Sequence, residues 1–594
     1  MLAAVLLMGA AAQSQPQMTR EFVGAFKVDS MWFHPTSDST VELVPCQGEC
    51  TPPGRFATVP ARVSHEGQTY AVTRIGRRAL RDIITTVLPE TVLDLGDDCM
   101  WASQTDSVRL PSSLRRIGSN SIAGTYPNLY IPAAVEHIDA NAFEKARVSH
   151  FTVDEGNRHY CSVDGFLYSA DTTELVAVPY NYRGEDGALV LPSTVRRIGA
   201  YAMRSVNSQL TTLTLPEGLE EIGLCGLGSY RWEVELPASV KRIEGCPVSL
   251  RPTVPFSLTV NPANPHYRVE DGQLMSMDGD TLLLVQLPAV QNTYTVPEGV
   301  NVLGDCLFCE WERQLDSITL PEGLEVIGAF AFSDIWSKVN IPSTLKSIKY
   351  GAFALSKLGG DLVLPQGVRE LEPYAFSACK ITSVVLPDSL EVIPKAAFVQ
   401  CSLLRSVTFG NCLREIHSEA FMSCNLLTSL PPLPATVRMV GYDALSWRVS
   451  YLEFEGAPEA IGSIAIRGAT AVRFGEGNPP RLYPDAMPSL DTVYVPCGMA
   501  EVYRGAALLG WGDRYHYVED CDGIGEAEAS DGLTVAVRGL DLQLAAADGA
   551  PVRVLDALGR TLYHGPAATL RLPAAGIYLV HTPGHKARKV VALP

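Results

Sequence analysis

Two thiols come closest to a recognisable chemical motif. Cys306 and Cys309 form a CxxC pair, a spacing found in redox-active loops and in one half of a zinc site. A zinc site needs two further ligands, and the sequence has neither a second CxxC pair nor two nearby histidines. We therefore expect Cys306 and Cys309 to be structural.

Catalytic motifs are missing from the rest of the sequence. It contains no phosphate-binding GxxxxGK[ST] loop, no HExxH and no GxSxG. The eleven histidines are scattered, and we expect surface positions for His137, His150, His159 and His417. We predict no catalytic residue, no metal site, no cofactor and no enzymatic activity.

Acidic and amide side chains gather in two similar segments. One contains Asp154, Glu155, Asn157 and Asp164, and the other Asn261, Asn264, Glu270 and Asp271. Such oxygen-bearing side chains can bind calcium, but the spacing of a calcium-binding helix-loop-helix is not present. Asn and Asp also form turns by bonding to their own backbone. We favour the turn interpretation, with calcium as the alternative.

The fourteen cysteines are too few for a disulfide-built scaffold in a chain of 594 residues. Cys379, Cys401 and Cys424 each follow an Ala-Phe pair by three residues, so we expect stacked, buried, free thiols. Disulfide candidates in an exported protein are Cys46 with Cys50 and Cys497 with Cys521, which lie outside the regular pattern.

Composition excludes several classes of partner. The formal net charge is −18, without any long block of like charge, which disfavours nucleic acid and anionic membranes. Hydrophobic residues make up 46% of the chain, enough for a continuous core. No stretch is long and apolar enough to span a bilayer, so no transmembrane segment is expected in the mature chain.

The elements that position these residues are short repeats. Each repeat has an alternating apolar run, Leu or Ile before Pro, two apolar positions, Gly, and then Ala-Phe. Most steps between the prolines are 21 to 24 residues, the length of one coil of a solenoid, and two steps are 60 because each contains an insert. The prolines are Pro89, Pro111, Pro132, Pro192, Pro216, Pro237, Pro297, Pro321, Pro342, Pro365 and Pro387.

The repeat ending resembles that of BspA-like leucine-rich repeat proteins of bacterial surfaces. The similarity rests on Ile222-Gly223, Ile327-Gly328 and the Ala-Phe pairs at Phe332, Phe376, Phe398 and Phe421. It implies a mainly β solenoid with short helical or 3-10 turns, in which parallel strands line one face, concave in leucine-rich repeats. Gly245-Cys246-Pro247 departs from the pattern, and irregular packing is expected there.

Within a coil, the run before Pro should be the strand. In Leu210–Pro216 a period of two turns Leu213 and Leu215 inward and Thr212 and Thr214 outward, and Pro216 ends the strand. We expect the Gly after Ile222 to permit a tight bend.

Outward strand positions then form two columns, the candidate binding face. The first column is Ser107, Asn128, Thr212, Glu233, Ser317, Lys338, Asp361, Ser383 and Ser406, and the second is Arg109, Tyr130, Thr214, Glu235, Thr319, Asn340, Val363, Val385 and Thr408. Arg109 and Tyr130 are candidate anchors. The alternative is that these side chains only keep the sheet soluble.

The chain divides into six parts by pattern. Residues 1–12 resemble a signal peptide without its basic start, the alternative being a disordered apolar tail. The other parts are a β cap at 21–74, the solenoid at 75–453 with hairpin-like inserts at about 150–188 and 255–294, irregular repeats and a cap at 454–522, a linker at 523–532, and a β-sandwich at 533–594. A short helix is expected from Ala500 to Leu509.

The last part resembles a type IX secretion sorting domain with an immunoglobulin-like fold. The similarity rests on Gly559, Arg560, Gly576, Tyr578 and Lys589 in their order and spacing. It implies export across the outer membrane of a Gram-negative bacterium by the type IX machinery, and then surface attachment or release. An ordinary immunoglobulin-like appendage is the alternative.

These patterns predict a secreted, cell-surface adhesion protein. The resemblance implies binding of extracellular proteins, such as host matrix proteins or proteins of neighbouring cells. A surface glycan-binding protein and a structural spacer without a specific ligand are the alternatives.

Overall fold

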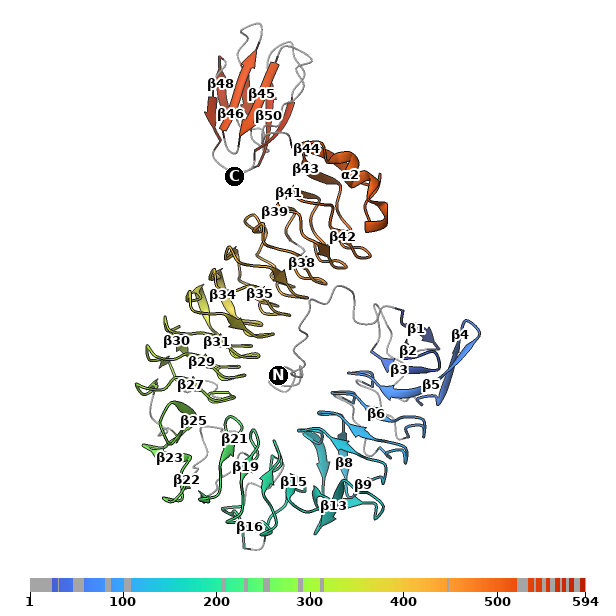
Figure 1. Cartoon of the computed structure of the whole chain (residues 1–594), viewed down its shortest axis with the longest axis vertical. Helices are drawn as coiled ribbons and strands as arrows, with labels where there is room; N and C mark the ends of the chain where they lie inside the picture. The colour runs from blue at the N-terminus through green and yellow to red at the C-terminus, as the bar shows by residue number, and fades with distance from the viewer. Residues whose placement is uncertain are drawn as a thin grey trace.

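The chain forms a long, curved β-solenoid in a computed structural model (Figure 1). Nearly all regular structure is strand, with one short α-helix and one 3-10 turn among the described residues. The structure describes residues 24–29, 31–45, 58–80, 87–100, 108–184, 186–204, 210–228, 233–248, 257–286, 292–309, 315–445, 448–520, 533–538, 541–546, 552–555, 561–566, 569–572, 576–581 and 588–592.

Each regular coil has two strands. The first precedes the proline and alternates exposed and buried side chains, as in Thr212–Thr214, where only Leu213 points into the core. The second is two residues long and ends in a buried Ile or Leu, as in Glu221–Ile222. Strands of both kinds pair in parallel with their counterparts in neighbouring coils, for example Ile222 with Ile243. The solenoid therefore has two strand faces where the sequence predicted one.

We call the sheets built from the strands before proline the outer sheet. Its strands, in pairing order, are β9 (Leu129–Ile131) and β12 (Phe151–Val153); β16 (Ala188–Val190), β18 (Thr212–Thr214), β20 (Glu233–Leu236) and β22 (Ser257–Val260); β26 (Thr293–Thr295), β28 (Ser317–Thr319) and β30 (Lys338–Val339); β32 (Gly359–Val363), β34 (Lys380–Val385) and β36 (Ser406–Thr408); and β39 (Tyr451–Gly456), β41 (Ala471–Glu476), β43 (Thr492–Pro496) and β44 (His516–Asp520).

The inner sheet contains the short second strands. They are β6 (Asp94–Leu95), β7 (Arg116–Ile117) and β10 (His137–Ile138); β17 (Arg197–Ile198), β19 (Glu221–Ile222) and β21 (Arg242–Ile243); β27 (Val302–Leu303), β29 (Val326–Ile327), β31 (Ser347–Ile348) and β33 (Glu370–Leu371); and β35 (Val392–Ile393), β37 (Glu415–Ile416), β38 (Met439–Val440), β40 (Ala460–Ile461) and β42 (Arg481–Leu482).

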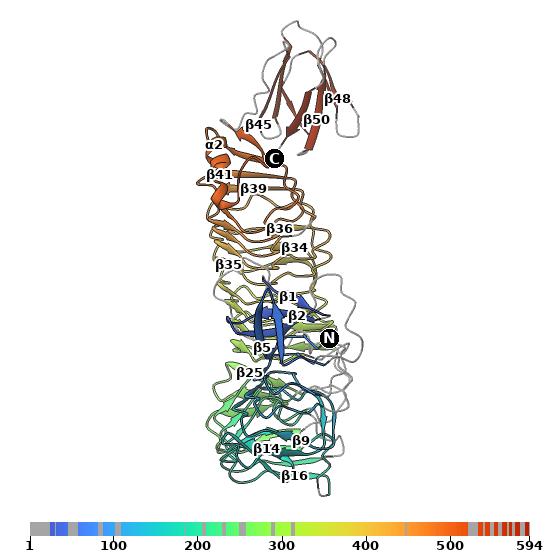
Figure 2. The same cartoon turned by 90° about the vertical axis from the view of Figure 1, so that its right-hand side faces the viewer.

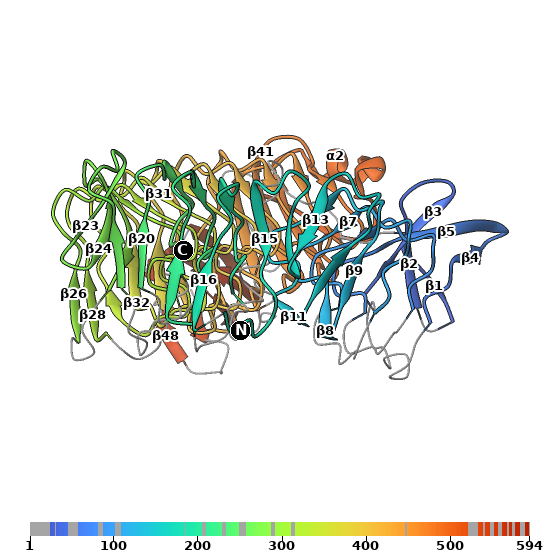
Figure 3. The same cartoon turned by 90° about the horizontal axis from the view of Figure 1, so that it is seen from below.

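The face before proline does not line the concave side, so that expectation is wrong. Figure 1 places β30 and β34 toward the outside of the curve and β31 and β35 toward its inside. Figure 2 shows β34 and β36 on one flank and β35 on the other, and Figure 3 separates β26 and β28 from β31 in the same way. The inside of the curve belongs to the inner sheet, whose two-residue strands are too short to show an alternation in the sequence.

Glycines follow the inner strands because the coils approach one another there. A Cβ on Gly223 would lie 2.5 Å from the backbone nitrogen of Ala200, and one on Gly328 would lie 2.6 Å from the carbonyl oxygen of Leu303. Neither glycine has a positive φ. Close contact between coils, not the expected tight bend, explains these residues.

The Ala-Phe turns form the third side of the coil and fill the core. Phe332, Phe353, Phe376, Phe398 and Phe421 are fully buried and stack face to face, with ring centroids 5.1–5.5 Å apart. Each turn also bonds the next: Phe376 N donates to Ala397 O at 2.9 Å, and Phe398 N donates to Ala420 O at 2.9 Å. Ring stacking and backbone hydrogen bonds therefore both link each turn to the next along the solenoid.

These turns hold two residues per coil in the left-handed backbone region, one two positions before the Phe and one two positions after it. The residue two before the Phe has a φ of 61° in Tyr374, 53° in Ala396 and 61° in Glu419. Such values are unfavourable for residues other than glycine. They are held here because the amide of the same residue bonds the next turn, as in Ala396 N to Ser418 O at 2.9 Å.

The expected column of buried, free thiols is present, with an added polar role. Cys379, Cys401 and Cys424 are free and buried. Their Sγ atoms donate to the carbonyl oxygens of Phe353, Phe376 and Phe398 at 3.0, 3.1 and 3.1 Å. Each thiol thus adds a second donor to a carbonyl that already accepts from the amide three residues further on, as Phe376 O does from Cys379 N at 3.3 Å.

Both inserts are three-stranded antiparallel meanders whose last strand joins the inner sheet. The first contains β13 (Tyr160–Val163), β14 (Phe166–Ser169) and β15 (Glu174–Ala177), and the second contains β23 (Tyr267–Glu270), β24 (Gln273–Ser276) and β25 (Thr281–Val285). Strand β15 pairs in parallel with β17, and β25 with β27. The sequence predicted hairpin-like inserts and missed the third strand of each.

The same asparagine anchors each insert. Asn264 Nδ2 donates to the carbonyls of Pro237 and Val240 at 2.9 and 3.0 Å, while its Oδ1 accepts from the amides of His266 and Tyr267 at 2.8 and 2.9 Å. Asn157 makes the corresponding four bonds in the first insert. These contacts confirm the turn interpretation of both asparagines.

Strands cover the N-terminal end of the described coils. Antiparallel pairs join β1 (Phe26–Val28) to β2 (Met31–Pro35) and β2 to β3 (Thr40–Val44). Another antiparallel pair joins β4 (Arg62–His65) to β5 (Gln68–Ile75). β3 pairs parallel to β5, which the expectation of an all-antiparallel cap missed, and β5 pairs with β6. A further small sheet, β8 (Ala123–Tyr126) with β11 (Lys145–Val148), lies on the turn side.

Aromatic side chains close the other end. Helix α2 (Ala500–Gly505) and the 3-10 turn η1 (Ala507–Leu509) occupy the segment predicted as a helix. Tyr503 on α2 packs against Trp511 at a centroid distance of 5.1 Å and against Phe474 at 5.9 Å. The open end of the core is thereby covered.

The C-terminal part consists of two antiparallel sheets. One contains β45 (Leu533–Arg538), β46 (Asp541–Ala546) and β49 (Thr569–Arg571), and the other contains β48 (Thr561–Gly565), β47 (Val552–Leu555), β50 (Gly576–His581) and β51 (Arg588–Ala592). Leu542 and Leu544 of the first sheet share a buried cluster with Val552, Val554 and Val580 of the second.

Replacing Phe376 by Ala should lower the free energy of unfolding by about 3–5 kcal/mol, because a fully buried ring is lost from between two neighbours. The exposed Thr319→Ala is the matched control and should change it by less than ~0.5 kcal/mol. Urea unfolding of both variants measures the difference, and equal midpoints would rule out a core role for the phenylalanine stack.

Asn264→Ala should cost about 1–3 kcal/mol or more, because two buried carbonyls and two amides lose their partner. Asn411→Ala, at an exposed position, is the control and should leave stability within ~0.5 kcal/mol. Thermal unfolding compares the two, and a neutral Asn264→Ala would show that the insert does not depend on this anchor.

Candidate binding face

The outer sheet exposes the predicted columns by simple alternation. On β18 and β20 the buried residues are Leu213, Val234 and Leu236, and their neighbours face solvent. The registers place Thr212 beside Glu233, Ser317 beside Lys338, and Ser383 beside Ser406. Neighbouring coils therefore bring the same position of the repeat side by side.

Most predicted members of the columns are exposed. Ser317, Ser383 and Val385 are half-buried, and Ser107 lies outside the described residues. The exposed members are Arg109, Asn128, Tyr130, Thr212, Thr214, Glu233, Glu235, Thr319, Lys338, Asn340, Asp361, Val363, Ser406 and Thr408.

The sequence missed the column members next to the inserts. Ala188 and Val190 pair with Thr212 and Thr214, and Thr293 and Thr295 pair with Ser317 and Thr319. The signal was available, because alternating runs precede Pro192 and Pro297 as they precede the other prolines. Ser257 and Thr259 of β22 lack even that signal, since no Leu-Pro pair follows them.

The columns are not one continuous surface. The described strands of the outer sheet divide into five separately hydrogen-bonded sheets, with interruptions near both inserts, between β30 and β32, and between β36 and β39. Residues of different sheets therefore do not share one flat face. The structure groups the predicted residues into local clusters.

One cluster lies around a hollow over β18, β20 and β22. The hollow has a volume of about 500 Å³ and is lined by Thr212, Thr214, Glu233 and Glu235 together with Glu217 and the missed Ser257, Thr259 and Asn261. Its only charged lining groups are the three carboxylates. No ion pair joins these carboxylates to another described residue, so the hollow is acidic.

Several other column residues are engaged within the protein. Asn128 and Asp361 accept from the hydroxyls of Thr152 and Ser383. The Tyr130 hydroxyl donates to an Asp154 carboxylate, and this bond raises the pKa of Tyr130 and lowers that of Asp154. Asn340 accepts from Leu320 N at 2.7 Å and donates to Leu320 O at 3.0 Å, so its amide completes the edge of β28. Asn340 is therefore a structural residue, and Tyr130 is held in place by Asp154.

The residues considered for metal and redox chemistry have structural surroundings. Cys306 and Cys309 are free and buried in a cluster that includes Cys246, and Cys225 lies close to both. The described residues contain no group of three His, Cys, Asp or Glu that could hold a metal ion. In the first insert, Asp154 Oδ1 accepts from Gly156 N at 2.8 Å, a turn contact.

One histidine lies where it was not expected. His137, His150 and His159 are exposed, but His417 is buried, and its Nε2 lies 2.9 Å from Glu415 Oε2. The surface expectation for His417 is therefore wrong. The neighbouring Glu415 provides the polar partner that makes burial possible.

Several expectations fall partly outside the described residues. Cys497 is disulfide-bonded, whereas Cys46, Cys50 and Cys521 are not described, so the pairings stay predictions. Gly559 and Arg560 are likewise not described. Gly576 and Tyr578 lie on β50 and Lys589 on β51, where Tyr578 pairs with Val590 and Leu579 with Lys589.

Comparison with known families identifies the solenoid. Residues 68–164, 186–245, 290–359 and 335–450 match the BspA type leucine rich repeat region in six copies, and together they cover more than half of the chain. The chain belongs to this family. No curated protein matches it.

Solved structures with similar repeats come from several bacteria. A leucine rich cell surface protein of Faecalibacterium prausnitzii is 19% identical over 65% of this chain and 94% of its own, with a TM-score of 0.32. The pneumococcal vaccine antigen PcpA is 15% identical over 84% and 100%, with a TM-score of 0.28. A leucine-rich repeat protein of Bacteroides ovatus is 17% identical over 83% and 99%, with a TM-score of 0.26.

Among the described residues, no helix has the length and apolar character needed to cross a membrane.

Thiol labelling should separate the cysteine environments. Cys412 is exposed, whereas burial raises the pKa of Cys379 and of Cys424 to about 12. At pH 8 iodoacetamide should therefore modify Cys412 in the native protein and reach Cys379 and Cys424 only after denaturation. Peptide mass spectrometry reads this out, and equal native labelling of all three would contradict the buried thiol column.

Proposed function

We propose that this protein is a secreted cell-surface binding protein whose outer sheet captures an extracellular protein. Its partner would present a basic segment to the hollow over β18, β20 and β22. The observation that carries the proposal is the grouping of Glu217, Glu233 and Glu235 around one hollow without a neutralising cation among its lining residues.

Physical chemistry favours a basic protein segment over other ligands of this face. Three carboxylates on one side of a hollow attract Lys or Arg and speed encounter through their field. The surrounding Thr212, Thr214, Ser257 and Thr259 offer hydroxyls that donate or accept hydrogen bonds. Matrix proteins of a host, or proteins of neighbouring cells, are the class of partner that the resemblance implies.

Two other functions have less support on this face. Glycan binding there would require aromatic side chains for stacking, and Tyr130, the only aromatic of the columns, is tied to Asp154. A structural spacer would not need uncompensated carboxylates grouped at one place. We retain protein binding without catalysis as the function of the outer sheet.

Export is the second component of the proposal. The two C-terminal sheets with their common buried cluster are compatible with an immunoglobulin-like sandwich. Together with the resemblance to type IX sorting domains, they support delivery across an outer membrane and then attachment or release. Deleting residues 533–594 in the native organism should leave the protein inside the cell envelope, and unchanged surface display would overturn this component.

Neutralising the hollow tests the binding function. The triple variant Glu217→Gln, Glu233→Gln and Glu235→Gln should weaken capture of immobilised matrix proteins about tenfold, because the attraction for basic groups is lost. Capture by the unaltered protein should also fall as salt is raised from about 0.05 to 0.5 M, through screening. Surface plasmon resonance measures both.

A control variant with the same change in net charge distinguishes the hollow from general charge effects. Glu155→Gln, Glu298→Gln and Glu476→Gln alter three exposed carboxylates outside the hollow and should leave capture unchanged. Equal loss of capture in both triple variants would show that net charge alone is responsible. Full capture by the hollow variant would place the protein ligand elsewhere.

A further inference from the structure

The first insert leaves a gap in the ladder of turns that the second insert does not leave. In regular coils the left-handed residue of one turn bonds the next turn, as in Asn120 N to Asn141 O at 3.1 Å and Tyr201 N to Leu224 O at 2.9 Å. At the second insert Cys246 N still reaches Asp305 O at 2.8 Å. Asn141 and Ala200, both described, have no corresponding bond across the first insert.

The two inserts differ because their flanking turns differ. The second is approached by Gly245-Cys246-Pro247, whose small residues pack onto Asp305 and Cys306. The first is approached by Asn141 and Glu144, and Glu144 Oε1 is bound by Arg204 Nη2 at 3.1 Å across the gap. This ion pair bridges the opening between the two turns.

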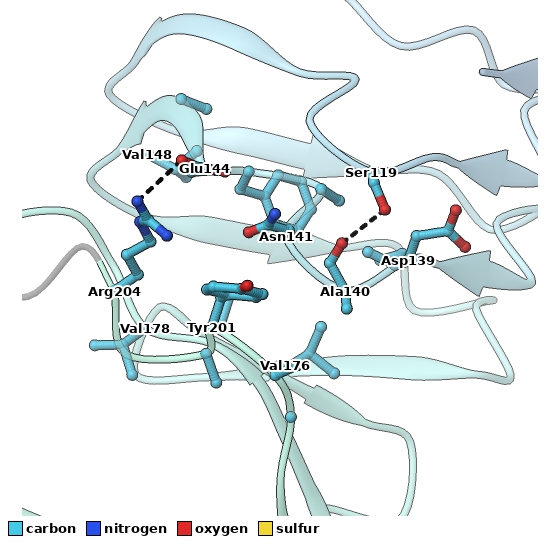
Figure 4. Close-up of a pocket in the computed structure, with 18 of the residues that line it drawn as sticks. Ser119, Asp139, Ala140, Asn141, Glu144, Val148, Val176, Val178, Tyr201 and Arg204 are labelled. Carbon is cyan, nitrogen blue, oxygen red and sulfur yellow. Dashed lines mark hydrogen bonds and ion pairs between the residues drawn. The ribbon is translucent and has the colours of Figure 1, made fainter. Parts of the chain in front are cut away.

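The gap is a pocket of about 500 Å³, within the range of about 300–1,000 Å³ typical of small-molecule sites. Its walls come from the turn at 139–146 on one side and the turn at 199–204 on the other. Figure 4 shows Asn141 facing the Tyr201 ring, with Val176 and Val178 beside the ring. The lining also includes the apolar Ala142, Phe143 and Phe151.

Charged groups of the pocket already have partners. Arg204 pairs with Glu144, and Arg197 pairs with Glu174 at 3.1 Å. Asp139 pairs with Arg116 and lies 2.8 Å from His137 Nε2. The pocket therefore has no uncompensated charge that would select an anion or a cation.

Two features of the walls remain available to a ligand. Asn141 Oδ1 is buried and has no hydrogen-bond partner among the described residues, so it can accept a bond from a hydroxyl. Tyr201 is half-buried on the pocket lining, close to the thiol of Cys225 and with the Arg204 guanidinium carbon 5.4 Å from its ring centroid, and the ring can supply an apolar surface. The carboxylates of Asp139 and Glu174 on the lining add further acceptors.

We propose that this pocket binds one hexopyranose ring, a neutral polyol with an apolar face. The ring would lie on Tyr201, and its hydroxyls would donate to Asn141 and to the carboxylates. An apolar ligand would leave the Asn141 acceptor unsatisfied, and a charged ligand would meet no opposite charge. The site is separate from the outer sheet, so it adds a sugar-binding activity to the proposed capture of proteins.

Saturation-transfer NMR with the full chain tests the pocket. The probes are the methyl glycosides of glucose, galactose, mannose and N-acetylglucosamine, and at least one should bind with a dissociation constant near about 1 mM. Tyr201→Leu, which keeps an apolar side chain but removes the ring, should weaken that binding about tenfold. Ala140→Trp, at an exposed position on the pocket lining, should abolish it by filling the opening.

Controls distinguish the pocket from other aromatic surfaces. Trp336→Leu removes an exposed aromatic in a distant coil and should leave binding unchanged. Unaltered melting temperatures show that the variants are folded. Binding that survives Ala140→Trp, or the absence of binding by any of the four glycosides at 50 mM, which is about 50 times the expected dissociation constant, would overturn the proposal.

Oligosaccharides that carry the bound sugar at their non-reducing end identify its source. Binding of the free glycoside alone indicates a free sugar, and tighter binding of the oligosaccharide indicates a surface glycan. Both results support the same ring-binding site. Because the outer-sheet variants leave this pocket unaltered, failure of one proposal can be told from failure of the other.

Discussion

The spacing between successive coils is the constraint on which the rest of the structure depends. Hydrogen bonds between parallel strands require neighbouring coils to lie about 4.7–4.9 Å apart. The phenylalanine rings stack at 5.1–5.5 Å, close to that interval, so rings and strands can repeat together. One spacing between coils is therefore compatible with the hydrogen bonds of both sheets and with the ring stacking of the core.

The inserts show how a repeat protein can change locally without losing this spacing. In each insert an asparagine bonds the coil before it, and a tyrosine hydroxyl accepts from the amide at the inner-strand edge: Tyr160 from Ile138 and Tyr267 from Ile243. The inner sheet is interrupted, but the edge amide keeps a partner. What differs between the inserts is the turn beside them, and the turn beside the first insert opens into a pocket.

Function in this architecture follows from what each side of the coil leaves exposed. The turn side is filled by stacked rings and thiols, and the inner strands are too short to present more than one outward side chain each. The outer sheet presents two per coil, and divides into local clusters because irregular coils interrupt its hydrogen bonding. Recognition by such a surface depends on clusters such as the acidic hollow, not on an uninterrupted column.

The sequence by itself determined the repeat, the buried phenylalanines and thiols, and the outward direction of the column residues, because these depend only on spacing and on a strand period of two. Only the tertiary structure decided the two-residue inner strands, the glycines at close approaches and the left-handed turn residues, because each depends on the adjacent coil. The burial of His417 beside Glu415 and the engagement of Asn340 with Leu320 follow the same logic. The pocket beside the first insert was hidden for a related reason: its two walls come from turns some sixty residues apart in the chain, which the Glu144–Arg204 ion pair bridges.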